Sequence, residues 1–446
     1  MRVVRSIEEA KGILQRSPFG TGEIPASMRE RIRDVFGEEL TPEEAVGRII
    51  ADVRQQGDAA LLDYTRRIDG VALDSLCVSS AEIEEACHGV DDGLLAALRL
   101  AAEQIRSFHQ AQMRHCYTEF SEAGLGQTVR PLDRVGVYVP GGTACYPSTV
   151  LMTAIPARVA GVREIALATP PRQGGEIPPA TLAAAHIAGV DAVFRVGGAQ
   201  AIAALALGTE SVARVDKVCG PGGLFIVLAK KMLFGIVGID GLEGPTETIV
   251  LADETADPSL VAADLLAQAE HDPLASALLI TTSAELAGET SREVERQLGS
   301  LERADIARES LDRNGCIIVV EGMEQAIELA NLYAPEHLSL MVRDPSYCVP
   351  RIRHAGGVFI GESSPETLGD YVAGPSHVMP TGGTARFRAP LCVADFLRIM
   401  SVVSLDDAAL RRLGKAAATI ARAEGFTAHA RAVEMRLAKG GHDGSS

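Results

Sequence analysis

The sequence has no uncharged apolar stretch of the roughly 20 residues that a membrane-spanning helix requires. It also has no signal-peptide pattern at its first residues, Met1–Arg5. These two absences predict a cytoplasmic protein with no membrane partner. Lys and Arg form no basic stripe, and the formal net charge is −17. Because nucleic-acid binding needs clustered Lys and Arg, the charge argues against a nucleic-acid partner.

Paired cysteines are also missing. The eight cysteines are dispersed, and none forms a Cys-x-x-Cys pair, which argues against a zinc knuckle or a redox centre of that type. We therefore expect reduced, mostly buried thiols. Cys145 lies in a glycine-containing segment, but no base stands beside it in the sequence. We interpret Cys145 as a small residue near a turn rather than as a nucleophile.

What is present indicates a globular α/β protein. The chain has 446 residues, of which 47% are hydrophobic and 23% charged, and this length allows two or three units that each bury a core. The N-terminal quarter has helical patterns. From Arg134 onward, short β-branched runs alternate with Ala-rich helices, and a second such series starts at Thr248. This alternation predicts two Rossmann-like parallel-sheet domains with helical N- and C-terminal extensions.

The expected domain boundaries follow from these changes in pattern. Residues 1–25 form a helical arm, and residues 26–137 together with 246–389 form the first α/β domain. Residues 138–245 form a second domain inserted in the first. Residues 390–446 form a helical tail, whose amphipathic pattern predicts that it packs on a partner or on another domain.

Two glycine-rich segments are candidates for phosphate binding. Gly197-Gly198-Ala199-Gln200 follows an expected strand and opens a helix, but it lacks the Gly-x-Gly-x-x-Gly pattern and an acidic residue about 20 positions later. Gly220-Pro221-Gly222-Gly223 is equally irregular. A plain turn fits each segment at least as well, although backbone amides at a helix start suit a pyrophosphate.

Scattered polar residues suggest a metal site. Gln268 and His271 are three residues apart at the end of a helical run, so both side chains leave one face. With the carboxylate of Asp370 and the imidazole of His429, they would nearly complete a shell that suits zinc. Taken singly, each has a simpler explanation: a solvated helix end, a turn cap or a satisfied histidine. Only their co-occurrence favours the metal.

Glu336-His337 comes just before an expected strand. One carboxylate and one imidazole at such a place can divide two proton transfers between them. The alternative is a loop whose polar groups face water, and for this segment alone that alternative is the stronger one.

Together these motifs make the chain resemble the histidinol dehydrogenase family from about Arg2 to Leu437. The resemblance rests on segments that occur in order along the chain: Tyr138-Val139-Pro140-Gly141-Gly142, Gly197-Gly198-Ala199-Gln200, Gln268-Ala269-Glu270-His271, Ala334-Pro335-Glu336-His337, Gly369-Asp370-Tyr371, His377-Val378-Met379-Pro380-Thr381 and Glu424-Gly425-Phe426-Thr427-Ala428-His429.

The resemblance implies a four-electron oxidation, the last step of histidine biosynthesis. L-Histidinol is oxidised through L-histidinal to L-histidine, and two NAD molecules are reduced. One Zn2+ per subunit would be held by Gln268, His271, Asp370 and His429, and it would position the substrate. His337 would accept the alcohol proton, and Glu336 would activate water for the aldehyde step.

The remaining site residues are also implied by the resemblance. Tyr138, Gln200 and Gly223 would contact NAD. The substrate-binding set would be Thr246, Gln268, His271, His337, Asp370, His377, Glu424 and His429. The family forms homodimers with exchanged C-terminal tails, so the terminal extensions would cross the dimer, and Glu424 and His429 would complete the neighbouring site.

The chain departs from the family pattern at two site positions. Gly223 stands where Asn is usual, which removes or replaces one cofactor contact. Thr246 replaces a substrate-contacting Ser, and the preceding Gly241-Leu242-Glu243 differs as well. Two other hypotheses therefore stay open: a paralogue that oxidises another small polar alcohol, such as a sulfonated diol, and a non-catalytic dimeric binding or scaffold subunit with a structural metal.

Overall fold

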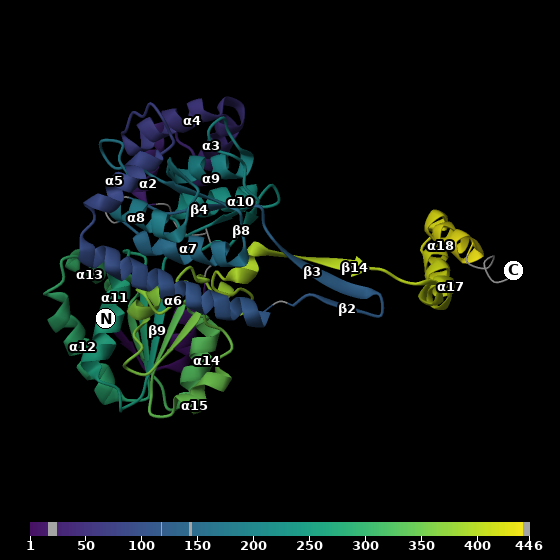
Figure 1. Cartoon of the computed structure of the whole chain (residues 1–446). Coiled ribbons are helices and arrows are strands. Elements are labelled where there is room, and N and C mark those ends of the chain that lie inside the picture. Colours follow the sequence, from purple (N-terminus) through teal and green to yellow (C-terminus); the bar gives the residue numbers. More distant parts are fainter. Residues whose placement is uncertain (17–24, 117, 142–144, 440–446) are drawn as a thin grey trace. The chain divides into compact units, whose positions relative to one another are not determined.

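The structure is a computed structural model that describes residues 1–16, 25–116, 118–141 and 145–439 (Figure 1). The chain divides into two compact units. Unit 1 comprises Met1–Arg114 and Leu132–Phe396, and unit 2 comprises His115–Pro131 and Leu397–Ser446. Part of the expected N-terminal arm (17–24), Gly142 of the first family motif and the chain end (440–446) lie outside the described residues.

Unit 1 contains a six-stranded parallel sheet. Its strands, in spatial order, are β1 (Arg2–Val4), β11 (Cys316–Val319), β10 (Ser276–Thr281), β9 (Glu247–Ala252), β12 (His337–Met341) and β13 (Gly357–Ile360). Every residue of β9 and β12 is buried. Burial on both faces explains why these central strands are nearly continuous apolar runs in the sequence.

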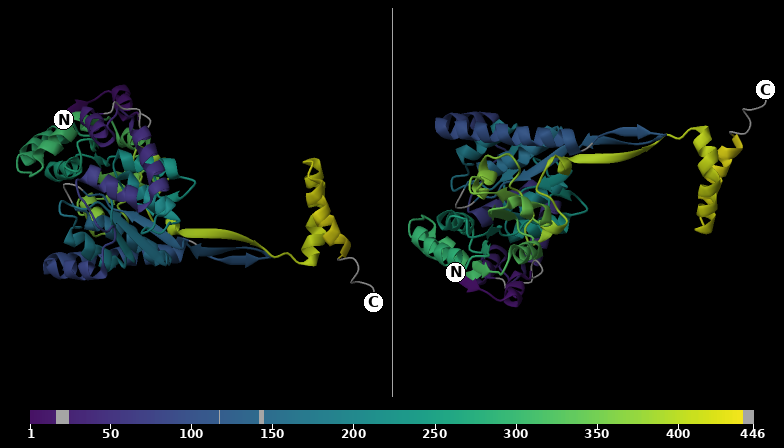
Figure 2. Two further views of the ribbon diagram at one scale, coloured as in Figure 1. Left: turned by 90° about the horizontal axis from the view of Figure 1, so that it is seen from above. Right: turned by 90° about the horizontal axis from the view of Figure 1, so that it is seen from below.

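Helices cover both faces of this sheet (Figures 1 and 2). Alternate residues of β9 divide between two cores: Ile249 and Leu251 face one, and Val250 and Ala252 face the other. The first core includes residues of α1 (Ile7–Leu14), α14 (Met323–Tyr333) and α15 (Pro345–Cys348). The short helix η2 (Val349–Arg351) follows α15 directly in the chain. The second core includes residues of α11 (Pro258–Ala269), α12 (Ala284–Leu298) and α13 (Ala304–Asn314).

A five-stranded parallel sheet forms the other layer of unit 1. In spatial order it contains β6 (Ala192–Arg195), β5 (Glu164–Thr169), β4 (Arg134–Tyr138), β7 (Lys217–Cys219) and β8 (Gly238–Ile239). The helices between its strands are α7 (Pro147–Ala160), α8 (Pro179–Ala188), α9 (Gly198–Leu207) and α10 (Leu224–Leu233). The two parallel sheets confirm the predicted α/β class.

The N-terminal helices are α2 (Ala26–Phe36), α3 (Pro42–Gln56), α4 (Asp58–Tyr64), η1 (Thr65–Asp69), α5 (Ser80–Gly89) and α6 (Asp92–Cys116). Thr41 and Ser79 start α3 and α5 with complete capping boxes. α3 packs on α9 and α10, and α5 packs on α8, so both contact the five-stranded layer. The sequence analysis grouped these helices with residues 246–389, which contain most of the six-stranded sheet. The domain boundaries stay a prediction.

The N-terminal residues are more closely integrated than a helical arm would be. Residues 2–4 form β1 and pair with β11, an element that the sequence analysis missed. α1 then starts after Ser6, whose hydroxyl accepts the Glu9 N–H. A three-residue edge strand has too little pattern to be recognised in the sequence.

Unit 2 has its own small antiparallel sheet, in the order β14 (Leu397–Val403), β3 (Leu125–Pro131) and β2 (Phe120–Glu122). It continues in α17 (Asp407–Ala423) and α18 (Thr427–Lys439), which pack on each other. The prediction of helix from Pro390 onward is wrong for β14. The reason is long-range pairing, since the partner strand β3 lies more than 250 residues earlier.

The cysteines only partly follow the prediction of buried thiols. Cys219, Cys316 and Cys348 are buried and free, whereas Cys77 and Cys145 are free and exposed. Cys219 lies on the buried strand β7, where burial raises the pKa of its thiol.

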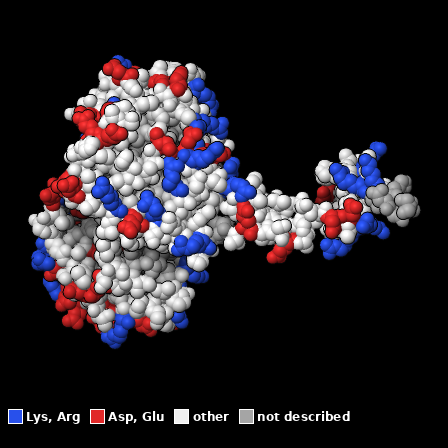
Figure 3. All heavy atoms as spheres, in the orientation of Figure 1, with Lys and Arg blue, Asp and Glu red and all other residues white. Residues whose placement is uncertain are grey.

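No described helix is long and apolar enough to cross a membrane. On the face of unit 1 shown in Figure 3, acidic and basic side chains are interspersed.

Candidate functional site

The predicted proton-transfer residues, Glu336 and His337, lie at the amino ends of two neighbouring strands. Glu336 comes directly before β12 and His337 is its first residue, while Thr246 comes directly before β9. His337 lies opposite Thr248 in the register. α11 returns from the carboxyl end of β9 towards the start of β10, so its last turn brings Gln268 to this edge. The two glycine-rich segments of the sequence analysis lie elsewhere, after β6 and β7 at the carboxyl ends of the five-stranded sheet.

Glu336 is buried beside polar neighbours. Its Oε2 accepts the Glu247 backbone N–H at 3.0 Å and lies 2.6 Å from the Thr246 hydroxyl. Burial raises the pKa of Glu336 to about 7, although His337 and these hydrogen bonds act in the opposite direction. A carboxyl with this pKa can both hold and release a proton near neutral pH.

His337 is surrounded by carboxyl groups. Its Nε2 lies 3.3 Å from Asp370 Oδ1, and its Nδ1 lies 3.6 Å from Glu336 Oε2. Burial acts to lower the pKa of His337, but the charges of Glu336, Glu366 and Asp370 outweigh it and raise the pKa to about 10. The aromatic ring of Phe359 stacks on the imidazole, with 5.7 Å between centroids.

The amide of Gln268 connects this pair to a further carboxyl group. It is fully satisfied when its nitrogen donates to Glu366 Oε1 at 3.1 Å and its oxygen faces the Thr246 hydroxyl at 2.6 Å. The Thr246 hydroxyl thus lies between the Glu336 carboxyl and the Gln268 amide, 2.6 Å from each. Thr246 therefore fits a hydrogen-bonded chain in which its hydroxyl is the essential group.

Sequence reasoning missed Glu366. It opens the short helix α16 (Glu366–Tyr371), accepts the Thr248 hydroxyl at 2.6 Å and is buried. Burial raises the pKa of Glu366 to about 8. One sequence signal was available: Glu366 precedes Asp370 by four residues, the spacing that places two side chains on one helix face.

Two histidines complete the cluster in unit 1. His377 Nδ1 donates to the Asp370 carbonyl at 2.7 Å, and its Nε2 lies 3.2 Å from the hydroxyl of Thr149 on α7. Burial lowers the pKa of His377, which favours the neutral imidazole. His271 follows α11 and interacts electrostatically with Asp370 and His337. The structure thus brings together most of the predicted substrate residues.

The donor set for a metal is only partly present in unit 1. Among the described residues, no three His, Cys, Asp or Glu side chains form a group that could hold a metal ion. Gln268, His271 and Asp370 offer an amide oxygen, an imidazole and a carboxylate, all chemically suitable for zinc. The predicted fourth ligand, His429, and the predicted substrate residue Glu424 belong to unit 2, where both are exposed.

The predicted cofactor residues lie at a different edge, the carboxyl ends of the five-stranded sheet. Tyr138 ends β4, and its hydroxyl accepts the Gly198 N–H at 3.3 Å. Tyr138, Gly198 and Gly223 line a cavity of about 1040 Å³. Gln200, two residues after Gly198, is fully buried, and neither polar atom of its amide has a hydrogen-bond partner in the described chain.

The turn that leads to Gly223 is held by a buried ion cluster. Lys230 Nζ donates to the Gly220 carbonyl at 2.5 Å and contacts Asp240 Oδ1 at 2.6 Å and Glu243 Oε2 at 3.3 Å. Asp240 also accepts the Gly220 N–H at 2.6 Å, so both backbone groups of Gly220 are fixed. Gly220 has φ +119°, and an added Cβ would collide with the Tyr138 carbonyl. Glu243, which belongs to the segment before Thr246 that differs from the family pattern, is thus paired with Lys230.

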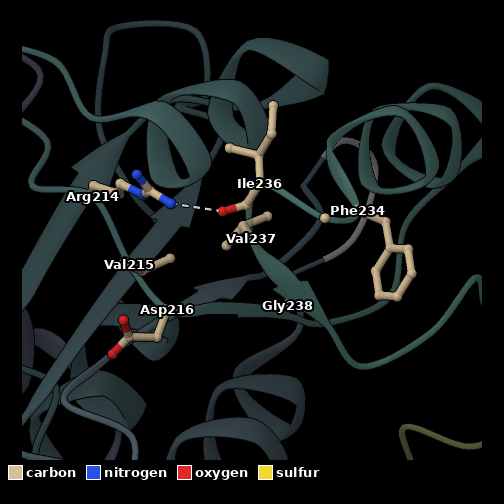
Figure 4. A pocket seen from close by; sticks show the side chains of 8 residues that line it. Arg214, Val215, Asp216, Phe234, Ile236, Val237 and Gly238 are labelled. Carbon is tan, nitrogen blue, oxygen red and sulfur yellow. Dashed lines mark hydrogen bonds between the residues drawn. The ribbon is translucent and has the colours of Figure 1, made fainter. Parts of the chain in front are cut away.

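A second hollow, of about 570 Å³, lies beside β8 and is lined by none of the predicted site residues (Figure 4). The polar groups there already have partners. Arg214 donates to the Ile236 carbonyl at 2.7 Å, and Asp216 accepts the N–H groups of Asp133 and Arg134. We assign no role in the site to this hollow.

Comparisons with known proteins identify close relatives. A family model described as histidinol dehydrogenase matches residues 37–437. The chain is 51% identical over 437 residues to histidinol dehydrogenase of Dehalococcoides mccartyi, covering 98% of this chain and 100% of the relative. It is 53% identical over 432 residues to histidinol dehydrogenase of Deinococcus radiodurans, covering 96% and 98%. A crystal structure of histidinol dehydrogenase from Elizabethkingia anophelis has a TM-score of 0.88 at 34% identity, covering 98% of this chain and 97% of that chain.

The ion cluster leads to a stability prediction. Replacing Lys230 with Met leaves Asp240 buried without its cation and leaves Glu243 with Arg388 alone, whose Nη1 lies 3.6 Å from Glu243 Oε1. The loss of the Lys230 charge should lower the free energy of unfolding by about 3–5 kcal/mol. Lys231→Met, one residue further along α10, changes an exposed side chain and should alter it by less than about 0.5 kcal/mol. Urea unfolding of both variants checks this. Equal stability of the two proteins would contradict the structural role of the cluster.

Proposed function

The chain belongs to the histidinol dehydrogenase family, and we propose that it oxidises L-histidinol through L-histidinal to L-histidine with two molecules of NAD. The observation that carries this proposal is the buried Glu336–His337 pair, with His337 facing Asp370 and Thr246 joining Glu336 to Gln268. The reaction belongs to histidine biosynthesis, and we place it in the cytoplasm, as the sequence analysis predicts.

His337 is the proposed base of both oxidations. In the first, it accepts the hydroxyl proton of the alcohol as a hydride passes to NAD. In the second, it accepts a proton from the hydrated aldehyde as another hydride leaves. Coordination of Asp370 would cancel one of the charges that keep His337 protonated, which would lower the pKa of His337 towards the range of a useful base.

Glu336 is the proposed base for the water that hydrates the aldehyde. Its pKa of about 7 suits this task near neutral pH, because the carboxylate is populated and still basic enough to accept the proton. Overall, one alcohol, one water and two NAD+ give one carboxylate, two NADH and three protons. Polar groups of the substrate would be held and oriented by the imidazole of His377, the amide of Gln268 and the hydroxyl of Thr246.

Zinc would be held by Gln268, His271 and Asp370, with His429 as the fourth ligand. When bound, it would position the substrate through the imidazole and amine rather than carry the redox chemistry. The amide, imidazole and carboxylate donors of unit 1 support this assignment. Unit 1 contains three of the four predicted ligands, and we assign the fourth to His429 of unit 2.

We further propose a homodimer in which each tail completes the partner's site. Two observations support it: His429 and Glu424 lie in a separate compact unit, and that unit exposes several large apolar side chains. They are Phe120, Leu125, Ile399, Met400, Val402, Val403, Leu405, Leu413, Ile420, Phe426 and Met435. Exposed apolar area of this kind is typical of a surface that becomes covered in an assembly.

Tyr138, Gln200 and Gly223 are the proposed NAD contacts. The start of α9 and the start of α10 both reach the 1040 Å³ cavity, and helix N-termini suit a pyrophosphate. Gly223 can offer its backbone, although the Asn side chain usual in the family is absent. The unpaired amide of buried Gln200 would gain partners on binding.

The two alternative hypotheses lose support. The near full-length relatives described above, about 50% identical, are histidinol dehydrogenases, so a paralogue acting on a sulfonated diol is not supported. A binding or scaffold subunit with a structural metal would have no use for a buried Glu-His pair that is so strongly perturbed.

The central test measures NADH absorbance with purified, zinc-loaded protein. We expect two NADH per L-histidinol, loss of activity on chelation and recovery on addition of zinc, because the metal positions the substrate. A sulfonated diol and other small alcohols serve as controls. Turnover of another alcohol but not of L-histidinol would contradict the proposal.

The division of labour predicts different effects of two substitutions. His337→Asn should slow both oxidations by about 100-fold or more, since it removes the base used twice. Glu336→Gln should mainly impair the oxidation of L-histidinal. Single-turnover rates measured separately for L-histidinol and L-histidinal distinguish the two. Equal losses in both half-reactions for Glu336→Gln would refute the assignment of water activation.

Tail exchange predicts complementation between two inactive variants. His271→Ala and His429→Ala should each lose nearly all activity. In a mixed dimer, one site combines the intact unit 1 of the second variant with the intact tail of the first. Co-expression of differently tagged chains, followed by purification through both tags, should therefore restore about half the wild-type activity per dimer. An inactive mixed dimer would show that each tail serves its own chain.

A further inference from the structure

Asp69 is an unassigned acidic group in the cofactor cavity. It ends η1, directly before Gly70, and lines the 1040 Å³ cavity together with Tyr138, Gly198 and Gly223. Its Oδ2 is buried and has no hydrogen-bond partner in the described chain. Asp69 is also close enough to Tyr138 for its charge to raise the pKa of that phenol, as burial does. A buried, unpaired carboxylate oxygen is costly unless a ligand completes it.

The acidic residue that usually ends the second strand of a Rossmann-type site is missing here. In Rossmann-type sites, an acidic residue at the end of the second strand accepts hydrogen bonds from ribose hydroxyls. The strand that follows β4 is β5, and it ends at Thr169, followed by Pro170 and Pro171, which line the cavity without any acidic group. The cavity therefore takes its carboxylate from the N-terminal helical segment.

We propose that Asp69 accepts hydrogen bonds from a ribose of the bound cofactor and thereby selects NAD over NADP. This role rests on the proposed function, because it requires a nicotinamide dinucleotide in this cavity. A carboxylate matches the paired hydroxyl donors of a ribose and repels the dianionic 2′-phosphate of NADP.

The neighbouring cation makes the selection depend on Asp69. Arg31 of α2 lines the same cavity, interacts electrostatically with Asp69 and donates to the Ile68 carbonyl. With Asp69 present, the two charges offset each other near the ribose. Without the carboxylate, Arg31 would present an uncompensated charge that attracts a 2′-phosphate.

The test compares binding of NAD and NADP to the full-length protein by titration calorimetry. Asp69→Asn, which keeps the shape, and Asp69→Ser, as a second variant, should each weaken NAD binding on the order of tenfold. NADP binding should stay the same or become tighter, so the preference for NAD should fall by about tenfold or more. Asp74→Asn, an exposed acidic residue five positions later, is the matched control and should change neither affinity.

The outcomes separate this role from the proposed function. Equal weakening of NAD and NADP, or an unchanged preference, would overturn the selective role of Asp69 while leaving the proposed function intact. A wild-type protein that prefers NADP would also overturn the selective role of Asp69. If the wild-type protein bound neither dinucleotide, the cofactor assignment itself would fail.

Discussion

The whole candidate site depends on one buried imidazole held among carboxyl groups. His337 lies between Asp370 and Glu336, with Glu366 in the next layer, and their charges outweigh the cost of burying a cation. Burial raises the pKa values of Glu336 and Glu366, although the charge of His337 acts in the opposite direction. The two buried carboxyl groups, with pKa values of about 7 and about 8, can therefore exchange protons near neutral pH.

The two parallel sheets contribute to the candidate site with opposite ends of their strands. The six-stranded sheet offers the amino ends of β9 and β12, where the acid–base groups stand, while the five-stranded sheet offers its carboxyl ends and their helix N-termini. A buried cation connects the two regions. Lys230 holds the Gly220 turn and also reaches Glu243, three residues before Thr246. The geometry of the cavity and that of the substrate segment are therefore tied to one cluster of charges.

Much of the fold could be predicted from the sequence because the buried strands of parallel sheets are locally distinctive. The runs around Val250, Leu279 and Ile318 are apolar and bounded by helices, and all of them form strands. Elements defined by distant partners were missed. β14 was expected to be helical because its pairing with β3 leaves no local pattern, and β1 is too short to stand out.

The sequence by itself determined the family, the chemical types of the site residues and the alternation of strands and helices, since these depend on local patterns and ordered motifs. Only the tertiary structure decided which groups meet. It placed Glu366 against Gln268, turned Thr246 into a link between Glu336 and that amide, and brought Asp69 into a cavity formed around Tyr138. The physical reason is that electrostatic coupling depends on separation in space and on burial, and neither quantity is encoded in the spacing of residues along the chain.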